Sequence, residues 1–237
     1  MKTKFKVLIG FLSIILILGF VVGFMFLKMQ SQSKNEDPLY WEKDIEKILE
    51  RYDEIPDVDI VFIGSSSIRK WESLEEDFSG YSVVNHGFGG SKVADSTYWY
   101  DELVTPFNPE VVVIFSGTND INGIEGNSKT GQEVFELVVD FVEYSLQENP
   151  SVEVYYISIS PTKARWDVWD EAKIANDLIK AYADITDMFT FIDTTDELLL
   201  NGEPNSNLFV FDGLHLNDDG YEIWANIIKP IVTETID

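Results

Sequence analysis

Five short apolar runs alternate with longer segments of mixed polarity along most of the chain. The runs are rich in β-branched residues, and most are nearly continuous rather than alternating with polar positions. Because a strand buried on both faces carries apolar residues at successive positions, this pattern predicts a parallel sheet. The predicted strands are 59–63, 82–85, 111–115, 152–159 and 189–192.

Helical periodicity fills the intervening segments. It predicts helices over 39–52, 92–105, 130–148, 168–187 and 218–235. Asn217-Asp-Asp-Gly220 predicts the cap of the last helix and not a calcium loop, because the twelve-position ligand spacing is absent. Strands and helices alternate throughout, so we expect an α/β fold in which helices cover both faces of the sheet.

The N-terminus carries a separate signal. Residues 7–27 contain no charged side chain, and a helix of this length spans roughly 30 Å, the thickness of a bilayer core. Lys2, Lys4 and Lys6 precede the run, which places the N-terminus in the cytoplasm and the rest outside. The run is longer than in a signal peptide and has no small-residue cleavage site after it. We therefore expect a single-pass transmembrane anchor, with secretion after cleavage as the alternative.

These patterns suggest three parts. Residues 1–28 form the expected membrane anchor, 29–57 a polar linker and a leading helix, and 58–237 one α/β domain. No internal repeat or second domain boundary is visible in the last part. Its length is ordinary for a single domain.

Composition narrows the choice of partners. The chain has 42 acidic and 17 basic residues, a net charge of −25. Nucleic-acid binding is disfavoured because it needs clustered Lys and Arg. An acidic surface also argues against bulk anionic lipid as a substrate. With no Cys and two His, a Cys/His zinc site is excluded, and we expect no metal.

Polar, often Gly-rich segments follow the predicted strands. In a parallel sheet the ligand crevice lies beyond the carboxyl ends of the strands, so these segments are expected to converge. Each segment alone is also typical of an ordinary turn or helix cap. They are Gly64-Ser-Ser-Ser67, His86-Gly-Phe-Gly-Gly-Ser91, Ser116-Gly-Thr-Asn-Asp120 and, ahead of the last helix, Asp212-Gly-Leu-His215.

Together these segments contain the groups needed for nucleophilic catalysis. A serine hydroxyl becomes a nucleophile when a base accepts its proton, and His215 follows Asp212 by three residues. A carboxylate bound to one ring nitrogen leaves the other nitrogen free to act as that base. The glycine-rich turn Gly89-Gly90 and the side chain of Asn119 offer a backbone N–H and an amide to a developing oxyanion. His86, which follows a strand, is interpreted as structural.

Four blocks in order resemble those of the SGNH (GDSL-type) hydrolase family. They are Phe62–Trp71, Val84–Gly90, Gly117–Asp120 and Asp212–His215, and the resemblance covers roughly residues 58–235. It implies a flavodoxin-like three-layer α/β/α sandwich with about five parallel strands. It also implies hydrolysis of acyl esters without a metal or organic cofactor.

The resemblance also implies roles for individual residues. Ser66 is the expected nucleophile, and Asp212 and His215 complete the triad. The Ser66 N–H, Gly90 and Asn119 form the expected oxyanion hole. Ser65 stands where the name-giving motif has Asp, which leaves Ser65 and Ser67 as alternative nucleophiles.

The expected function is that of a membrane-anchored, extracytoplasmic serine esterase that cleaves short acyl esters, such as acetyl groups on a sugar or envelope glycan. Arg165, Trp166 and Trp169 follow the fourth predicted strand and are candidate substrate contacts, with ordinary helix packing as the alternative. Three other functions stay open: an acyltransferase with the same triad, a lysophospholipase-type lipid esterase, and a non-catalytic surface-binding domain.

Overall fold

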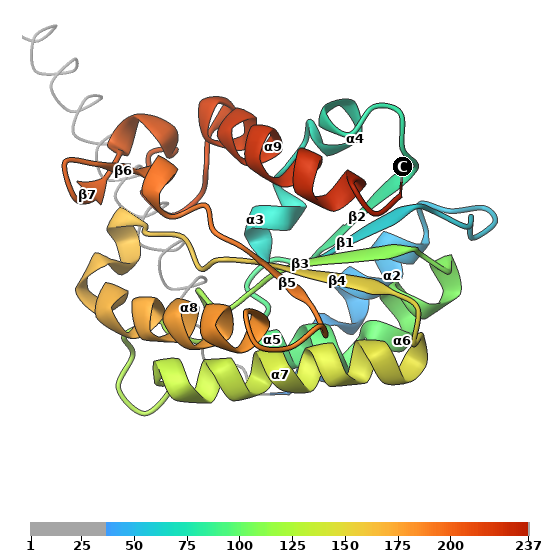
Figure 1. Cartoon of the computed structure of the whole chain (residues 1–237), viewed down its shortest axis with the longest axis horizontal. Coiled ribbons are helices and arrows are strands. Elements are labelled where there is room, and N and C mark those ends of the chain that lie inside the picture. The colour runs from blue at the N-terminus through green and yellow to red at the C-terminus, as the bar shows by residue number, and fades with distance from the viewer. Residues whose placement is uncertain (1–36, 237) are drawn as a thin grey trace, which may run out of the picture. The chain divides into compact units, whose positions relative to one another are not determined.

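The computed structural model describes residues 37–236, and these form a three-layer α/β/α sandwich around a five-stranded parallel sheet with the order β2-β1-β3-β4-β5 (Figure 1). The predicted strands are confirmed to within two residues at each end. The strands are β1 (Ile60–Gly64), β2 (Val83–Gly87), β3 (Val111–Phe115), β4 (Glu153–Ile157) and β5 (Thr190–Ile192).

Burial explains the nearly continuous apolar runs. Every residue of β1 and β3, which lie inside the sheet, is buried. Successive side chains point to opposite faces. Val61 and Ile63 accordingly join the hydrophobic core on one face, whereas Phe62 joins the core on the other. Both faces therefore require apolar side chains.

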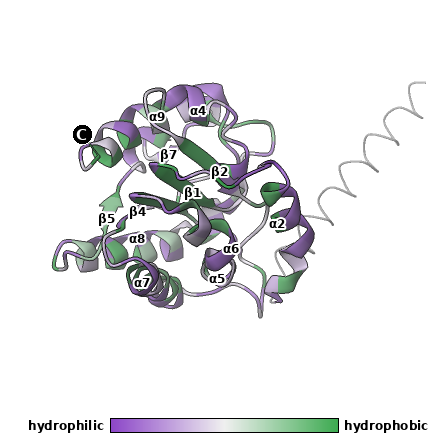
Figure 2. Cartoon of the chain, turned by 90° about the vertical axis from the view of Figure 1, so that its right-hand side faces the viewer, coloured by the Kyte–Doolittle hydropathy of each residue, from purple (hydrophilic) through white to green (hydrophobic). Residues whose placement is uncertain are grey.

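Helices cover both faces, as predicted (Figures 1 and 2). One layer contains α2 (Glu42–Leu49), α5 (Val93–Tyr98), α6 (Tyr100–Leu103), α7 (Gly131–Glu148) and α8 (Trp169–Ala183). The other contains α3 (Ser66–Arg69), α4 (Leu74–Asp77) and α9 (Asp218–Thr233). Between these layers, Figure 2 shows the hydrophobic strands in green.

Capping side chains set the start of the two longest helices of the sandwich. Thr130 and Glu133 form a reciprocal capping box at α7. The Asn217 side chain accepts a hydrogen bond from the Gly220 N–H at 3.0 Å, which confirms the predicted cap of α9. The position of this cap matters because the segment immediately before it carries Asp212 and His215.

The leading segment packs into the same core as the sheet. It consists of a 3₁₀ turn, η1 (Pro38–Trp41), followed by α2, and it buries Trp41, Ile45 and Ile48. The Trp99 indole N–H donates to the Pro38 carbonyl oxygen at 3.0 Å. Residues from Asp37 onward thus form one compact unit.

Two local expectations differ from the structure. The predicted helix 92–105 is broken at Trp99 into α5 and α6, and the indole of Trp99 is held by the leading segment. The break thus coincides with a tertiary contact, which periodicity does not reveal. A small antiparallel hairpin, β6 (Leu199–Leu200) with β7 (Glu203–Pro204), was not expected because its strands are too short for a pattern.

The predicted fold class requires one correction, which concerns its transmembrane helix. The apolar run over residues 7–27 lies outside the described residues. Within residues 37–236 no helix has the length and apolar character needed to cross a membrane. The longest of these, α7, has 18 residues and carries charged side chains such as Glu136 and Asp140. The architecture that residues 37–236 support is the sandwich, and this part of the chain contains no transmembrane helix.

Candidate active site

The turn between β1 and α3 presents Ser66. Gly64 ends the strand with φ +135°, and a Cβ atom there would overlap the Phe115 carbonyl oxygen of β3. Only glycine fits this close approach. The Ser65 N–H donates to the same carbonyl oxygen at 3.0 Å, so the chain turns sharply and α3 begins at Ser66. This geometry puts Ser66 at the carboxyl end of an interior strand of the sheet.

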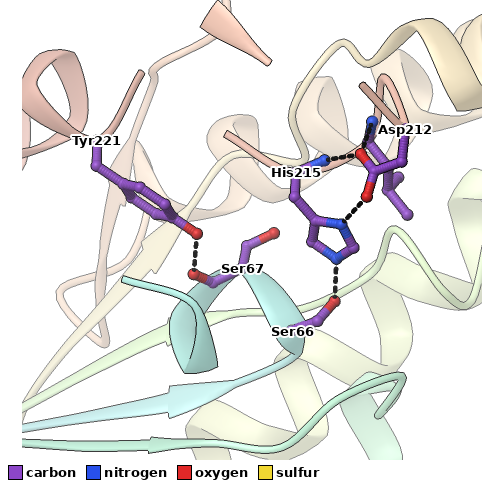
Figure 3. Close-up of polar contacts among 6 residues, drawn as sticks. Ser66, Ser67, Asp212, His215 and Tyr221 are labelled. Carbon is purple, nitrogen blue, oxygen red and sulfur yellow. Dashed lines mark hydrogen bonds and ion pairs between the residues drawn. The ribbon is translucent and has the colours of Figure 1, made fainter. Parts of the chain in front are cut away.

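Ser66, His215 and Asp212 form one continuous hydrogen-bonded chain (Figure 3). The His215 Nε2 atom lies 2.8 Å from the Ser66 Oγ, and the His215 Nδ1 atom lies 2.7 Å from an Asp212 carboxylate oxygen. The structure thus brings together two residues 149 positions apart in the sequence. This is the arrangement of nucleophile, base and orienting carboxylate that acyl transfer requires.

The protonation of this chain follows from the environment of Asp212. Burial by itself would raise the pKa of Asp212, but hydrogen bonds from the His215 ring and from the N–H groups of His215 and Leu214 hold that pKa well below its ordinary value. An ionised carboxylate can only accept hydrogen bonds, so Nδ1 of His215 carries the proton. In the neutral ring, Nε2 is then an acceptor for the Ser66 hydroxyl.

Among the three consecutive serines, Ser66 is the one whose hydroxyl contacts His215. Ser65 is buried and precedes α3 as its cap residue. Ser67 lies on α3, where its carbonyl oxygen accepts a hydrogen bond from the Tyr221 hydroxyl at 2.7 Å (Figure 3). The geometry therefore favours Ser66 over the two alternatives that the sequence leaves open.

The three expected oxyanion donors lie at the carboxyl ends of adjacent strands. Gly64 is in register with Gly87 of β2 and with Phe115 of β3, so the loops that follow begin at the same level of the sheet. Within residues 37–236 the N–H groups of Ser66 and Gly90 donate to no other group. Such N–H groups are available to an oxyanion.

Asn119 is fixed against the loop that carries Gly90. Its side-chain amide is buried and donates one hydrogen to the Ser91 carbonyl oxygen at 2.9 Å. An amide nitrogen carries two hydrogens, so one is left for a ligand. The Gly90 loop and the loop after β3 are thereby held together, which would keep the donors in a constant geometry.

Asp120, the next residue, is a completely buried carboxyl group that the sequence does not single out. One of its oxygens accepts from the Val93 N–H at 3.2 Å, and the other has no partner in the described part of the chain. Burial raises the pKa of Asp120 to about 7, against the opposing effects of the Val93 N–H and of Lys92. The carboxyl group therefore titrates near neutral pH. It belongs to the residue that directly follows Asn119 in the sequence.

His86 is a core residue, as predicted, and it lies within β2. Its Nδ1 lies 2.6 Å from the Leu103 carbonyl oxygen and its Nε2 lies 2.9 Å from the Tyr52 hydroxyl. The carbonyl can only accept, so Nδ1 carries the proton and Nε2 accepts from Tyr52. Burial lowers the pKa of His86 to about 4, which keeps the ring neutral.

The side chain of Asn85, on β2, holds the helix that carries Ser66. Its side-chain nitrogen donates to the Ile68 carbonyl oxygen at 2.6 Å and to the Trp71 carbonyl oxygen at 3.3 Å, and its side-chain oxygen accepts from the Gly87 N–H at 3.1 Å. These bonds join the end of β2 to the end of α3, the helix that begins at Ser66. The sequence offers no signal for this role beyond an Asn next to a strand end.

The candidate substrate contacts lie on the 3₁₀ segment η3 (Lys163–Val168) and at the start of α8. The Ala164 N–H donates to the Gly213 carbonyl oxygen at 3.0 Å, which places η3 against the loop that holds Asp212 and His215. Trp166 and Trp169 are half-buried and stack on each other with ring centroids 5.9 Å apart. Their role in substrate binding, and that of Arg165, stays a prediction.

Potential metal ligands can be located in the described part of the chain. No group of three or more His, Asp or Glu side chains within residues 37–236 is placed to hold one. The groups placed together at this site are the Ser66 hydroxyl, the His215 ring next to it and the Asp212 carboxylate behind that ring.

The sequence also matches a known protein family. Residues 41–223 match the sequence model of the GDSL-like Lipase/Acylhydrolase family. The match covers most of the chain and includes the whole β sheet and every residue of the Ser66 hydrogen-bonded chain.

Individual proteins give a more detailed comparison. The N-acylneuraminate cytidylyltransferase of Escherichia coli O18:K1:H7 is 30% identical over 209 residues, which are 85% of this chain and 47% of that protein. The chain thus spans about half the length of this curated relative.

Two solved structures share the fold. A protein assigned as an acylhydrolase from Bacteroides fragilis is 25% identical, with a TM-score of 0.67 over 86% of this chain and 100% of its own. An acetyl xylan esterase is 20% identical, with a TM-score of 0.59 over 73% of this chain and 99% of its own.

Proposed function

We propose a specific reaction for this chain, which belongs to the GDSL-like lipase/acylhydrolase family and is an ester hydrolase. The proposed reaction is the hydrolysis of short acyl esters, with acetyl esters of sugars as the substrate class. The observation that carries the proposal is the unbroken hydrogen-bonded chain from Ser66 through His215 to Asp212, with distances of 2.8 and 2.7 Å.

In the first half of the reaction, the Ser66 Oγ attacks the ester carbonyl carbon while its proton passes to the His215 Nε2. When the tetrahedral intermediate collapses, that proton passes to the departing alcohol oxygen, and the acyl group remains on Ser66. In the second half, His215 takes a proton from water, the hydroxide attacks the acyl carbon, and the acid leaves as Ser66 regains its hydrogen.

Asp212 acts on the base throughout this cycle. Its carboxylate keeps the proton of His215 on Nδ1 and stabilises the imidazolium that forms when Nε2 is protonated. The carbonyl oxygen becomes negatively charged in the tetrahedral intermediate, and the N–H groups of Ser66 and Gly90 with the amide of Asn119 are the proposed donors to it. Loss of one such donor typically raises the barrier by about 2.7–4 kcal/mol.

Two considerations support an acetylated sugar, and a third opposes an anionic lipid. One structural neighbour is an acetyl xylan esterase, an enzyme whose name gives an acetylated sugar as its substrate. The stacked Trp166 and Trp169 lie on the segment that is bonded to the triad loop, and aromatic rings suit the apolar faces of sugars. A net charge of −25 disfavours an anionic lipid surface.

The test is a substrate panel with two single-residue variants. We expect the wild-type protein to hydrolyse p-nitrophenyl acetate and acetylated xylose faster than esters with longer acyl chains. Ser66→Ala and His215→Ala are each expected to lower kcat by about 10³-fold or more, because each removes a member of one catalytic unit. Ser67→Ala is the matched control and should retain activity, since the Ser67 contact in the site uses its backbone carbonyl.

Labelling with a fluorophosphonate gives a second measurement that does not depend on the choice of ester. Mass spectrometry should locate the adduct on Ser66 in the wild-type protein and find none in His215→Ala. A Ser66→Ala protein that hydrolyses p-nitrophenyl acetate at the wild-type rate would refute the proposed nucleophile. Addition of a sugar acceptor to the assay would show whether the acyl group passes to water or to another hydroxyl.

A further inference from the structure

Arg69 is the last residue of α3, the short helix that begins at Ser66. Residues three positions apart lie on the same side of a helix, with about 5–6 Å between their Cβ atoms. Arg69 is exposed, whereas the apolar Ile68 before it is buried in the core. The side chain of Arg69 therefore leaves the helix on the side that bears Ser66.

The guanidinium lies directly on the backbone of Gly89. A Cβ atom at Gly89 would be 2.6 Å from the Arg69 Cζ and 2.7 Å from both terminal nitrogens, so any larger residue would displace the group. Gly89 precedes Gly90, one of the proposed oxyanion donors. Because Gly89 has no side chain, the Arg69 guanidinium can lie against its backbone, next to the proposed oxyanion donor Gly90.

The guanidinium of Arg69 has no partner in the described part of the chain. The chain has three arginines. Arg51 donates to the carbonyl oxygens of Ile48 and Asn85, and Arg165 donates to that of Ala164. The side chain of Arg69 makes no hydrogen bond or ion pair with any of residues 37–236, although the chain carries 42 acidic residues.

An unpaired guanidinium beside a binding site is suited to a carboxylate. It offers several N–H donors in a rigid plane, and it can form two parallel hydrogen bonds with the two oxygens of one carboxylate. Solvation of an exposed arginine is the ordinary alternative. Two features distinguish Arg69 from that alternative: the space that Gly89 leaves for it and its place three residues after Ser66.

We propose that Arg69 is a specificity-determining residue that binds a carboxylate on the alcohol part of the ester substrate. This proposal rests on the proposed esterase function, in which the acyl part is too short to carry the charge. One guanidinium balances one negative charge, which favours a carboxylate over a phosphate dianion. The net charge of −25 repels anions from the surface at large, so an anionic substrate requires such a local partner.

The test compares two esters that differ by one charge, 3-acetoxybenzoate and 3-acetoxybenzamide, with the full-length protein. The measured quantity is the ratio of kcat/KM for the carboxylate to that for the amide. We expect this ratio to be about ten in the wild-type protein and to fall by roughly tenfold in Arg69→Gln, as for the loss of a charge-assisted hydrogen bond. Arg69→Lys should give an intermediate ratio because it keeps the charge but not the planar fork.

Lys70→Gln is the matched control. It removes the same charge from the next residue. The three atoms nearest to a Cβ at Gly89 all belong to Arg69, so the ratio should stay at the wild-type value in Lys70→Gln. A ratio that Arg69→Gln leaves unchanged, or that Lys70→Gln lowers equally, overturns the proposal. In the first case Arg69 does not bind the substrate anion, and in the second the effect is that of overall charge.

A binding measurement separates this proposal from the proposed catalysis. Calorimetric titration of the Ser66→Ala protein with the product 3-hydroxybenzoate needs no turnover. We expect 3-hydroxybenzoate to bind at least tenfold more weakly to the double variant Ser66→Ala/Arg69→Gln than to Ser66→Ala. This result supports the anion site even if the wild-type protein cleaves neither ester, and then only the esterase proposal fails. Equal binding by both proteins, with 3-hydroxybenzamide as the uncharged reference, overturns the role of Arg69 whatever the activity.

Discussion

Asp212 and Asp120 are both partly or wholly buried carboxyl groups near the same site, yet their environments shift their pKa values in opposite directions. Three hydrogen bonds from Leu214 and His215 keep Asp212 ionised. Asp120 has one weaker bond, to the Val93 N–H, and an oxygen without a partner in the described residues. The number of hydrogen-bond donors around each carboxyl group thus affects whether that group is ionised. The ionised Asp212 accepts a hydrogen bond from His215, whereas Asp120 next to Asn119 holds a proton up to a higher pH.

The raised pKa of Asp120 predicts a pH-dependent stability. Between its ordinary value of 3.8 and about 7 the folded protein holds a proton that the unfolded chain releases, so the stabilising contribution is full below 3.8 and is lost as the pH rises through about 7. The Asp120→Asn side chain still accepts a hydrogen bond from the Val93 N–H, but it does not ionise, so its contribution to stability does not change with pH. From pH 4 to pH 8 the variant should gain stability relative to wild type, on the order of 2–4 kcal/mol.

Urea unfolding at several pH values measures this difference. The surrounding charges are those of Lys92, Asp95 and Lys129, and they are the same in both proteins. Asp167→Asn provides a control with an equal charge change at an exposed position, and its stability difference measures the effect of the charge change alone. A constant difference between wild type and Asp120→Asn across this range would contradict the assigned titration.

At the scale of elements, the site depends on how β2 holds α3. The helix has only four residues, too few to be stable by itself. Its position follows from the Gly64 turn, the buried Ile68 and the bonds from Asn85 to the carbonyl oxygens of Ile68 and Trp71. A side chain on a neighbouring strand therefore helps to define where Ser66 lies.

Asn85→Ala is expected to lower both stability and activity. It removes the side-chain hydrogen bonds to the carbonyl oxygens of Ile68 and Trp71, which keep their backbone donors, the N–H groups of Trp71 and Leu74. Loss of such a hydrogen bond typically costs about 0.5–1.5 kcal/mol. Because α3 carries Ser66, kcat should fall several-fold while the protein remains folded, as measured by thermal unfolding and ester hydrolysis. Asn149→Ala is the control, since that side chain bonds to Ser151 after α7, away from the site. An equal loss of kcat in both variants would contradict the positioning role.

Sequence patterns predict the bounds of a strand or helix well where its residues are uniformly buried. They predict these bounds poorly where contacts with distant residues are involved. β3 is predicted at its observed bounds because every position is apolar and buried. The break at Trp99 coincides with a bond to Pro38, and the choice of Ser66 over its neighbours depends on the direction of one hydroxyl. The place of Arg69 depends on a missing side chain at Gly89, twenty positions away.

At the scale of the whole molecule, the dominant feature is the charge of −25. Such a surface repels itself, and the repulsion is relieved when the chain expands on unfolding. Added salt screens it, since the Debye length falls from about 30 Å at 0.01 M to about 3 Å at 1 M. The melting temperature at pH 7 is therefore expected to rise by several degrees between about 0.01 and 0.5 M NaCl.

Differential scanning calorimetry at two pH values separates charge repulsion from other salt effects. Near the isoelectric point of about 4.2 the net charge vanishes, and the same salt increase should change the melting temperature much less. An equal increase at both pH values would show that the salt acts by another route, such as a general effect on the burial of apolar surface.

The separation of Ser66 from His215 by 149 positions has a consequence for biosynthesis. While the ribosome is still making the chain, the serine emerges long before the histidine. α9 follows later still, and its Tyr221 hydroxyl bonds to the carbonyl oxygen of Ser67. A nascent chain that lacks this helix has no complete triad environment, so the protein stays inert toward esters until both His215 and α9 have emerged.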